Sequence, residues 1–363
     1  MKTNNKKKII IATGGTGGHI FPAYSLAKNF TKNNYLVEII TDKRGLKYLD
    51  KHENIKLILN NSATIFQKNI VNLFLSVFII SISYVRSLII LYRKKPLVVF
   101  GMGGHASFPV CIAARTLNIP FIIYENNIQI GKSNKYLLPF AFKIFTSYPE
   151  LVGIKKKYQH KVIITGNIIR DEILNLKKKN KFTPGILNIL VLGGSQAAKS
   201  FGELLPKVFE RCKKEKIKIK IFQQCIESQT EKLNKMYTNL NFDFELFNFT
   251  NNIKKYFLKT ELAITRSGSS VTAELINCKI PFISIPYPHA ADSHQDKNAT
   301  YFEKKGYSLL VRELEINEKL FPLIKTFYKD KKLLDKMIKK QKKHSDKNVF
   351  FKINKVIEKL KNE

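Results

Sequence analysis

The chain has 363 residues, of which 44% are hydrophobic, and carries a formal net charge of +35. This length predicts two domains of ordinary size, and the charge favours an anionic partner: nucleic acid, anionic lipid headgroups or a phosphorylated substrate. Lysines spread along the whole chain also fit a compositional bias without function. The four cysteines lie far apart and form no Cys-x-x-Cys pair, which argues against a zinc site or disulfide framework and favours a reducing cytoplasm.

Residues 9–22 carry the first informative pattern. A basic N-terminus precedes an apolar run of only four residues, Ile9 to Ala12, so we expect no signal peptide. This run is typical of a buried strand, and Gly-Gly-Thr-Gly-Gly-His at 14–19 and a helical pattern follow it. Such a turn points N–H groups at an anion. The motif lacks the Lys-Ser/Thr of a P-loop and the third glycine of a dinucleotide fingerprint, and a simple tight turn is the alternative.

Residues 65–92 follow two further strand patterns, at 35–41 and 55–59, which predict a parallel α/β sheet. No charge occurs among the 17 residues between Lys68 and Arg86, which is the lower limit for a membrane span. A narrow polar stripe on this apolar helix also fits a fully buried helix or a helix lying on a membrane surface. All three interpretations stay open, and the flanking basic residues suit anionic headgroups.

A second strand, Gly-rich turn and helix occurs at 97–109, with Gly-Met-Gly-Gly-His at 101–105. The strand at 121–124 ends in Glu125-Asn126-Asn127, and these polar residues either line the same crevice or cap a helix. Ligands of open parallel sheets bind at the carboxyl ends of the strands. Two such loops together therefore indicate a phosphate-type site.

The pattern restarts in the second half of the chain. Strands at 143–146 and 162–165 lead to Gly166, and we expect the domain junction between Gly166 and Asn188. A third strand and Gly-rich turn occupies 188–199, and strands at 218–223 and 242–247 follow.

The segment 262–274 is the second candidate phosphate site of this half. Ser267 can cap a helix whose first N–H groups can take a phosphate. Glu274, two turns in, either reaches a ribose or is an exposed helix carboxylate. The chain then enters a loop with His289 and His294, which is only a weak signal for a metal.

The residues alone thus predict two doubly wound α/β domains whose phosphate-type loops face one cleft, with a nucleotide in the second domain. No Asp-x-Asp motif that would serve a metal-dependent transferase is present. A metal-independent transferase fits, in which backbone dipoles and Arg170 neutralise a leaving diphosphate.

Seven motifs in one order resemble the MurG family of GT-B glycosyltransferases of peptidoglycan synthesis. They span nearly the whole chain and are Gly-Gly-Thr-Gly-Gly-His at 14–19, Gly-Met-Gly-Gly-His at 101–105, Glu-Asn-Asn at 125–127, Gly-Asn-x-x-Arg at 166–170, Gly-Gly-Ser-Gln at 193–196, Arg-Ser-Gly at 266–268 with Glu274, and Asp-x-His-Gln-x-x-Asn at 292–298. The resemblance implies two Rossmann-like domains. These are an acceptor- and membrane-binding domain at 1–168 and a UDP-GlcNAc-binding domain at 169–344, with a C-terminal helix at 345–363 packing back on the first.

The resemblance also implies an activity. It is the inverting, metal-independent transfer of N-acetylglucosamine (GlcNAc) from UDP-GlcNAc to the C4 hydroxyl of N-acetylmuramic acid (MurNAc) in lipid I, which gives lipid II without a cofactor. The implied partners are UDP-GlcNAc, the polyprenyl-linked lipid I and, through residues 65–95, an anionic membrane surface, and no nucleic acid is expected. The implied location is peripheral, on the cytoplasmic face of the bacterial inner membrane.

Residue roles follow from the same motif matching. His19 is the candidate general base, or else a helix-start residue that contacts phosphate only. The acceptor and its diphosphate are assigned to Thr16, Gly17, Gly18, Gly103, Gly104, His105, Glu125, Asn127 and Asn134. On the donor side, Phe249 and Thr250 are assigned to the uracil, and Glu274 to the ribose. Arg170, Ser195, Ser269 and Ser270 are assigned to the diphosphate, and His294, Gln295 and Asn298 to the sugar. Gln196 is assigned to donor binding without a more specific contact.

The chain also departs from the family pattern. His105 replaces a usual Tyr, Phe108 a Gly, Asn126 a Gln, Ala197 a Gly and His294 a Gln, and the usual proline is missing from 166–170. These departures affect loop details and rate but remove no proposed reacting group. One alternative is a related GT-B enzyme with another lipid acceptor. The other is a non-catalytic nucleotide- or nucleic-acid-binding protein, whose binding of polynucleotide would depend strongly on salt.

Overall fold

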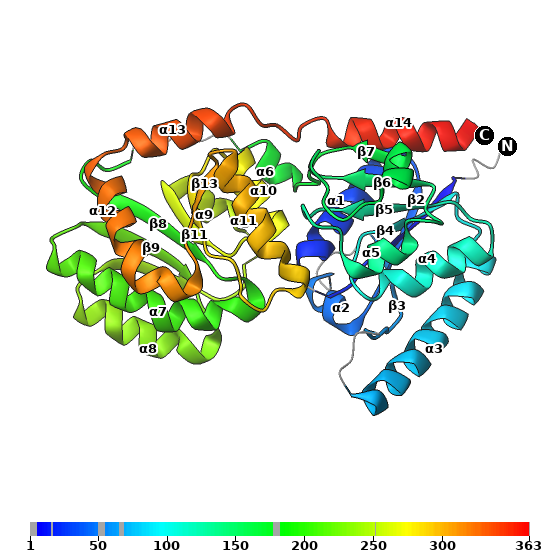
Figure 1. Ribbon diagram of the computed structural model, residues 1–363, viewed down its shortest axis with the longest axis horizontal. Helices are drawn as coiled ribbons and strands as arrows, with labels where there is room; N and C mark the ends of the chain where they lie inside the picture. Colours follow the sequence, from blue (N-terminus) through cyan, green and yellow to red (C-terminus); the bar gives the residue numbers. More distant parts are fainter. Residues whose placement is uncertain are drawn as a thin grey trace. The chain divides into compact units, whose positions relative to one another are not determined.

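The computed structural model describes residues 6–15, 17–49, 55–64, 69–176, 182–250 and 252–362. The chain divides into two compact units (Figure 1). Unit 1 comprises Met1–Arg170 and Asp346–Glu363, and unit 2 comprises Asp171–Ser345. The chain therefore passes from one unit to the other twice.

Unit 1 is built on a parallel sheet with helices on both faces. Among the described residues the strand order is β3-β2-β1-β4-β5-β6-β7. The strands are β1 Lys8–Ala12, β2 Leu36–Thr41, β3 Lys56–Leu59, β4 Val98–Gly101, β5 Phe121–Glu125, β6 Lys143–Thr146 and β7 Val162–Ile164. The helices are α1 Gly17–Lys32, α2 Lys43–Leu49, α3 Ile70–Lys94, α4 Ser107–Thr116, α5 Lys132–Leu137, the short η1 Lys156–Lys161 and α14 Val349–Asn362. Ile9 and Ile11 pack into one core and Ile10 into the other, because successive side chains of a strand point to opposite faces.

Unit 2 repeats this plan with strand order β10-β9-β8-β11-β12-β13, again all parallel in the part of the chain described. The strands are β8 Leu187–Leu192, β9 Ile219–Gln224, β10 Asp243–Phe247, β11 Leu262–Thr265, β12 Phe282–Ser284 and β13 Ser308–Leu310. The helices are α6 Asp171–Leu174, α7 Gly194–Lys214, α8 Glu227–Asn239, α9 Lys254–Lys259, α10 Ser269–Asn277, η2 Ala291–Ser293, α11 His294–Lys304, η3 Glu313–Glu315, η4 Ile316–Leu320, α12 Phe321–Lys329 and α13 Lys332–Gln341. The two units confirm the predicted fold class. Strand β13 was not predicted from the sequence, although β7, which is equally short, was.

Helix α3 exposes most of its large apolar side chains and buries three of its serines. Asn69 caps its start by accepting a hydrogen bond from the Val71 N–H (2.9 Å). The buried positions of α3 are Ser76, Ser83, Ser87 and Leu91. The exposed large side chains are Ile70, Val71, Leu73, Phe74, Leu75, Val77, Phe78, Ile79, Ile82, Val85, Ile89 and Tyr92. This is the reverse of an ordinary surface helix, so the interpretation of residues 65–92 as a fully buried helix is wrong.

The serine stripe of α3 is the face that holds the helix to unit 1. Ser87 Oγ accepts a hydrogen bond from Asn60 Nδ2 (2.8 Å) and donates one to the Ser83 carbonyl oxygen (2.7 Å). Asn60 Nδ2 also donates to the Ser83 carbonyl (3.1 Å). Within the described residues, α3 is the one helix long and apolar enough to cross a membrane. Its length and composition fit a span, and its attachment through serines leaves the apolar face uncovered.

Helix α14 belongs to the core of unit 1, although it lies at the far end of the sequence (Figure 1). Val349, Ile353 and Ile357 recur at helical spacing, are fully buried and share one core cluster with β1 and α1. At the point where the chain re-enters unit 1, the buried Asp346 carboxylate accepts a hydrogen bond from the Asn167 N–H (2.9 Å). The last helix is therefore anchored beside the end of β7.

Candidate functional site

Two Gly-rich loops meet at one edge of the unit 1 sheet. They follow β1 and β4, which are neighbours in a parallel sheet, so both loops leave the same edge. The Met102 N–H donates to the Ala12 carbonyl (2.9 Å), which joins the loops where they begin. Gly103 and Gly104 have φ values of 92° and 78°, a region that only glycine adopts readily.

Glycine is needed in the second loop because the first loop lies against it. A Cβ at position 104 would lie 2.6 Å from the Gly14 carbonyl oxygen. A Cβ at position 103 would lie 2.8 Å from both Cε1 and Nδ1 of His19. The His19 imidazole therefore packs directly on the second loop, and the structure brings together three of the residues predicted from the motifs.

Glu125, at the end of β5, organises the third predicted segment. One carboxylate oxygen accepts hydrogen bonds from the backbone and side-chain N–H groups of Asn127 (3.1 and 3.2 Å). The other accepts from the Gly131 N–H and from Asn134 Nδ2 (both 2.9 Å). Burial raises the pKa of Glu125, and these donors oppose that rise. Glu125 thus orients Asn127 and Asn134, and its oxygens are already bonded within the chain.

A charged pair that the sequence analysis did not single out borders the first loop. Asp42 follows β2, and its Oδ1 accepts hydrogen bonds from the N–H groups of Gly15 (3.1 Å) and Gly45 (2.8 Å). Its Oδ2 accepts from Nη2 (3.0 Å) and Nε (3.2 Å) of Arg44. Burial acts to raise the pKa of Asp42, but these donors lower it overall. Burial and the Arg44 charge lower the pKa of the neighbouring His105.

In unit 2, β8 and β11 are neighbours, and a Gly-rich or Ser-rich helix start follows each. Helix α7 begins at Gly194, whose N–H donates to Gln224 Oε1 at the end of β9 (3.2 Å). Helix α10 begins at Ser269. The first N–H groups of a helix have no intrahelical partner and favour anions. Two helix starts therefore lie at adjacent strand ends, where their N–H groups can face an anion.

The predicted sugar residues lie on α11 and are tied to the same loops. Asn298 is fully buried and donates from Nδ2 to the Ser267 carbonyl (3.0 Å). Gln295 Oε1 accepts a hydrogen bond from the Tyr287 N–H (2.9 Å). On α10, Ser269 and Glu274 are buried. The two hydrogen bonds fix α11 against the loops after β11 and β12.

The remaining predicted residues are dispersed. Arg170 is the last residue of unit 1, and its guanidinium lies 5.2 Å from the centre of the Phe21 ring. Phe249 is 53% exposed, and Thr250 Oγ1 accepts a hydrogen bond from the Asn252 N–H (3.0 Å). Thr16 lies outside the described residues, as do the side chains of Ser195 and Gln196. The roles assigned to all these residues stay predictions.

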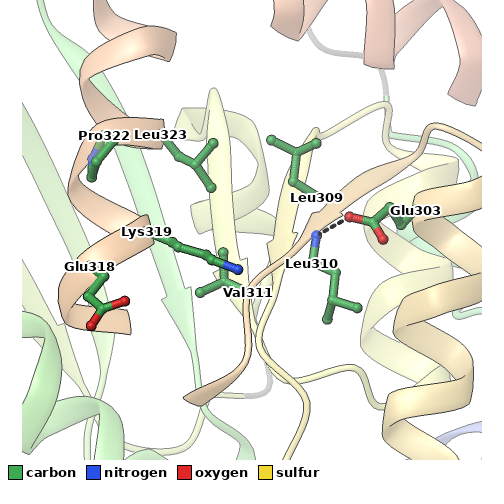
Figure 2. Close-up of a pocket in the computed structure, with 8 residues that line it drawn as sticks. All are labelled: Glu303, Leu309, Leu310, Val311, Glu318, Lys319, Pro322 and Leu323. Atoms are coloured by element: carbon green, nitrogen blue, oxygen red, sulfur yellow. Dashed lines mark hydrogen bonds between the residues drawn. The ribbon is translucent and has the colours of Figure 1, made fainter. Parts of the chain in front are cut away.

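The pocket in Figure 2 lies elsewhere in unit 2. It has a volume of about 420 Å³ and lies between β13 and the η4–α12 segment, away from the motif-bearing loops. Its lining residues are Glu303, Leu309, Leu310, Val311, Glu318, Lys319, Pro322 and Leu323. None of them is a predicted donor residue. Among the described residues, no group of three or more His, Cys, Asp or Glu side chains is arranged to hold a metal ion.

Comparisons with known proteins agree with this arrangement. The model of the glycosyltransferase family 28 N-terminal domain matches residues 9–146, and that of the family 28 C-terminal domain matches residues 188–351. The crystal structure of Acinetobacter baumannii MurG superposes with a TM-score of 0.77 at 23% identity, covering 98% of this chain and 99% of that one. This similarity supports the GT-B fold.

Two curated relatives carry the name UDP-N-acetylglucosamine–N-acetylmuramyl-(pentapeptide) pyrophosphoryl-undecaprenol N-acetylglucosamine transferase. The Pelagibacter ubique protein is 36% identical and covers 86% of each chain. The Rickettsia canadensis protein is 37% identical over 84% of this chain and 86% of its own. With both halves matched by family 28 and this identity over most of its length, the chain belongs to the MurG family of glycosyltransferases.

Proposed function

We propose that this protein transfers GlcNAc from UDP-GlcNAc to lipid I, as its relatives' name describes, and so forms lipid II for peptidoglycan synthesis. The observation that carries the proposal is the meeting of the two Gly-rich loops of unit 1 around His19, in a chain that belongs to the MurG family. Loops of this kind suit the diphosphate of a polyprenyl-linked acceptor, because their N–H groups bind phosphate oxygens.

The reaction requires a base beside the acceptor hydroxyl. We assign this role to His19, because imidazole accepts a proton near neutral pH. His19 would take the proton of the MurNAc C4 hydroxyl. The hydroxyl oxygen would attack C1 of GlcNAc on the face opposite UDP. The C1–O bond to UDP would break, and UDP would leave with the electron pair. One displacement of this kind inverts the configuration at C1.

The donor half of the proposal uses unit 2. The helix starts of α7 and α10 would bind the diphosphate, Glu274 the ribose, Phe249 and Thr250 the uracil, and α11 the sugar. Arg170 and these N–H groups would offset the charge that develops on the leaving diphosphate, which is the work a metal ion performs in other transferases. We therefore propose that the transfer is metal-independent.

The uncovered face of α3 supports a peripheral location on the cytoplasmic leaflet, where the lipid acceptor is anchored. Helix α3 exposes large apolar side chains beside basic residues. Such a helix binds anionic bilayers because its apolar side chains become buried in the bilayer and its basic residues are attracted to the headgroups. Arg86 and Arg93, both exposed on α3, supply the positive charge. The location follows from the proposed acceptor and from this face together.

A transfer assay with two acceptors tests the proposal. Labelled UDP-GlcNAc is offered with a lipid I analogue or with diacylglycerol, in EDTA, and the linkage of the product is determined by NMR. We expect product from the lipid I analogue alone, joined at C4 with the configuration opposite to that of the donor. Transfer to diacylglycerol alone would identify another lipid glycosyltransferase, and no activity without a divalent cation would refute the metal-independent mechanism.

A further inference from the structure

We propose that the Arg266–Glu313 ion pair positions the loops of the donor site without itself contacting the donor. The inference rests on the assignment of UDP-GlcNAc to unit 2 under Proposed function. Neither residue belongs to the predicted site. Arg266 directly follows β11, in front of the α10 helix start, and Glu313 begins η3.

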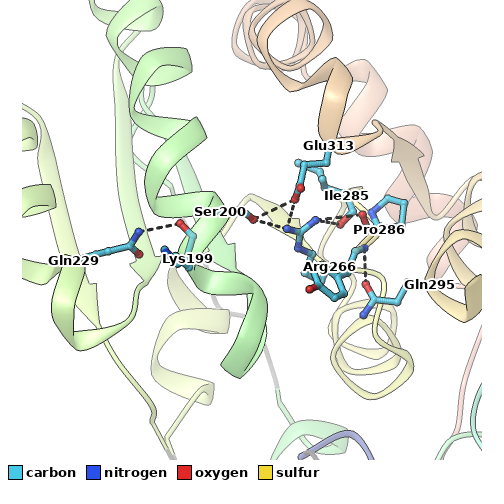
Figure 3. A network of polar contacts seen from close by, with 9 residues as sticks. Lys199, Ser200, Gln229, Arg266, Ile285, Pro286, Gln295 and Glu313 are labelled. Atoms are coloured by element: carbon cyan, nitrogen blue, oxygen red, sulfur yellow. Dashed lines mark hydrogen bonds and ion pairs between the residues drawn. The ribbon is translucent and has the colours of Figure 1, made fainter. Parts of the chain in front are cut away.

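One guanidinium joins three segments of unit 2 (Figure 3). Arg266 Nη1 donates to the carbonyl oxygens of Ile285 and Pro286 (both 3.2 Å). Its Nη2 donates to Ser200 Oγ (2.5 Å) and to the Glu313 carboxylate, and Ser200 also bonds to Glu313 (3.1 Å). The side chain therefore connects α7, the loop after β12 and η3.

These segments carry the predicted donor residues. The first turn of α7 holds Ser195 and Gln196, and Ser200 lies on the same helix. Directly after Pro286, the Tyr287 N–H donates to Gln295 Oε1 (2.9 Å). The residue after Arg266, Ser267, accepts a hydrogen bond from Asn298. A shift of Arg266 would therefore move the α7 helix, the loop after β12 that bonds to Gln295, and the start of α10 together.

Arg266 is placed to hold these segments and not to bind the ligand. It is 3% exposed, and the rings of Phe201 and Tyr287 lie 4.4 and 5.4 Å from its guanidinium. Isolating a charge from water in this way costs several kcal/mol before its partners compensate, so a buried pair is a poor device for stability alone. What it supplies here is a fixed geometry, because loss of the Glu313 carboxylate leaves the buried Arg266 charge to move or find water.

The other end of the same strand offers a matched control. Glu261 directly precedes β11, and its side chain is 6% exposed. It accepts hydrogen bonds from the Asn188 backbone N–H (3.1 Å) and from Lys331 Nζ (2.6 Å). The two carboxylates thus belong to ion pairs at opposite ends of β11, and each pair has one buried partner, Arg266 in one and Glu261 in the other. Only Glu313 bonds to a residue at the carboxyl end, where the helix starts lie.

The experiment measures UDP binding by calorimetry, with thermal unfolding in parallel, for the full chain as wild type, Arg266→Lys, Glu313→Gln and Glu261→Gln. We expect the first two variants to weaken UDP binding about tenfold, or about 1.4 kcal/mol. Glu261→Gln should lower Tm while changing UDP affinity less than about twofold, since its hydrogen bonds lie at the other end of the strand. The double variant Arg266→Lys/Glu313→Gln should bind UDP no more weakly than the weaker single variant, because the two residues act as one unit.

Unchanged UDP affinity in both Arg266→Lys and Glu313→Gln would overturn the positioning role, and so would an equal loss in Glu261→Gln. If Arg266→Lys does not fold, Glu313→Gln decides, because its amide oxygen can still accept a hydrogen bond from Arg266. Failure of the wild type to bind UDP would instead overturn the donor assignment made under Proposed function, and the positioning role with it.

Discussion

His105 shows how a single residue adapts where the chain departs from the family pattern. Its lowered pKa, set by burial and the Arg44 charge, leaves the imidazole neutral at neutral pH. In the second Gly-rich loop it can therefore donate a hydrogen bond, as the usual tyrosine would, but adds no positive charge. Because the unfolded chain binds the proton more tightly, stability falls as the pH drops through the ordinary value of 6.5.

We therefore predict that His105→Gln is less sensitive to acid than the wild type. The Tm of the variant relative to wild type should rise as the pH is lowered from about 7.5 to about 5.5, the range over which an unperturbed histidine titrates. Thermal unfolding at a series of pH values measures this difference. A Tm difference that stays constant over the range would contradict the lowered pKa.

Glu125 leads to a prediction about stability. Glu125→Gln keeps the shape of the side chain but turns an NH₂ group toward the N–H donors of Asn127, or toward those of Gly131 and Asn134. Buried N–H donors that lose their acceptor lower the free energy of unfolding by about 1–3 kcal/mol. Urea unfolding should show a loss of that size, while Glu150→Gln, at an exposed position, should change stability much less. Equal stability of Glu125→Gln and wild type would show that the carboxylate does not organise this loop.

At the residue scale, site residues that directly follow a strand could be predicted from the sequence. Residues that contact these loops from distant parts of the sequence could not. Gly103, Gly104 and Glu125 could be predicted because a Gly-rich or polar segment after an apolar run is a local signal. Asp42 and Glu313 could not, because their contacts to Gly15 and Arg266 span 27 and 47 residues. A single sequence without homologues does not show which distant side chains pair.

At the scale of elements, α3 shows why periodicity alone left three interpretations. The sequence shows an apolar helix with a narrow polar stripe, but not which side faces the protein. The structure turns the serines inward, because Ser83 and Ser87 bond to Asn60 and small side chains allow close packing. The apolar majority is therefore left outside, where an ordinary surface helix would be polar.

We predict that replacing Phe74 and Phe78 by Ser weakens association with anionic vesicles at least tenfold, since burying one such side chain contributes about 1.5–3 kcal/mol. Sedimentation with phosphatidylglycerol vesicles measures the change, and raising the salt concentration should also reduce binding. Phe351→Ser is the matched control, because Phe351 is as exposed as Phe74 (both 70%) but lies on α14. Vesicle binding that resists both the α3 substitutions and salt would exclude a surface role for this helix.

Helix α14 is the second element with its own test. Its apolar spacing predicts an amphipathic helix, but nothing local says which surface it covers. In the structure Ile353 is fully buried in the core of unit 1. Ile353→Ala should therefore lower the free energy of unfolding by about 2–5 kcal/mol, whereas Phe351→Ala, at an exposed position, should have little effect. Equal effects of the two substitutions in urea unfolding would place α14 outside the core.

At the scale of the whole molecule, the fold was the most predictable property. Apolar runs of strand length alternate with helical patterns, and the pattern restarts after Gly166, so two parallel α/β units follow from the sequence. The sheet orders and the register of neighbouring strands come only from the structure, because parallel neighbours are joined through long crossovers. The net charge of +35 describes the molecule as a whole and indicates an anionic partner without choosing one.

The central claim is that the molecule carries out one transfer reaction with a base from unit 1 and a donor site in unit 2. The most direct test compares wild type, His19→Ala and Glu274→Ala in GlcNAc transfer from UDP-GlcNAc to a lipid I analogue, with UDP binding measured on the same samples. We expect both variants to lose at least about a hundredfold in rate, and only Glu274→Ala to lose UDP affinity. Wild-type rates in Glu274→Ala, or no transfer by a wild type that binds UDP-GlcNAc, would contradict this account.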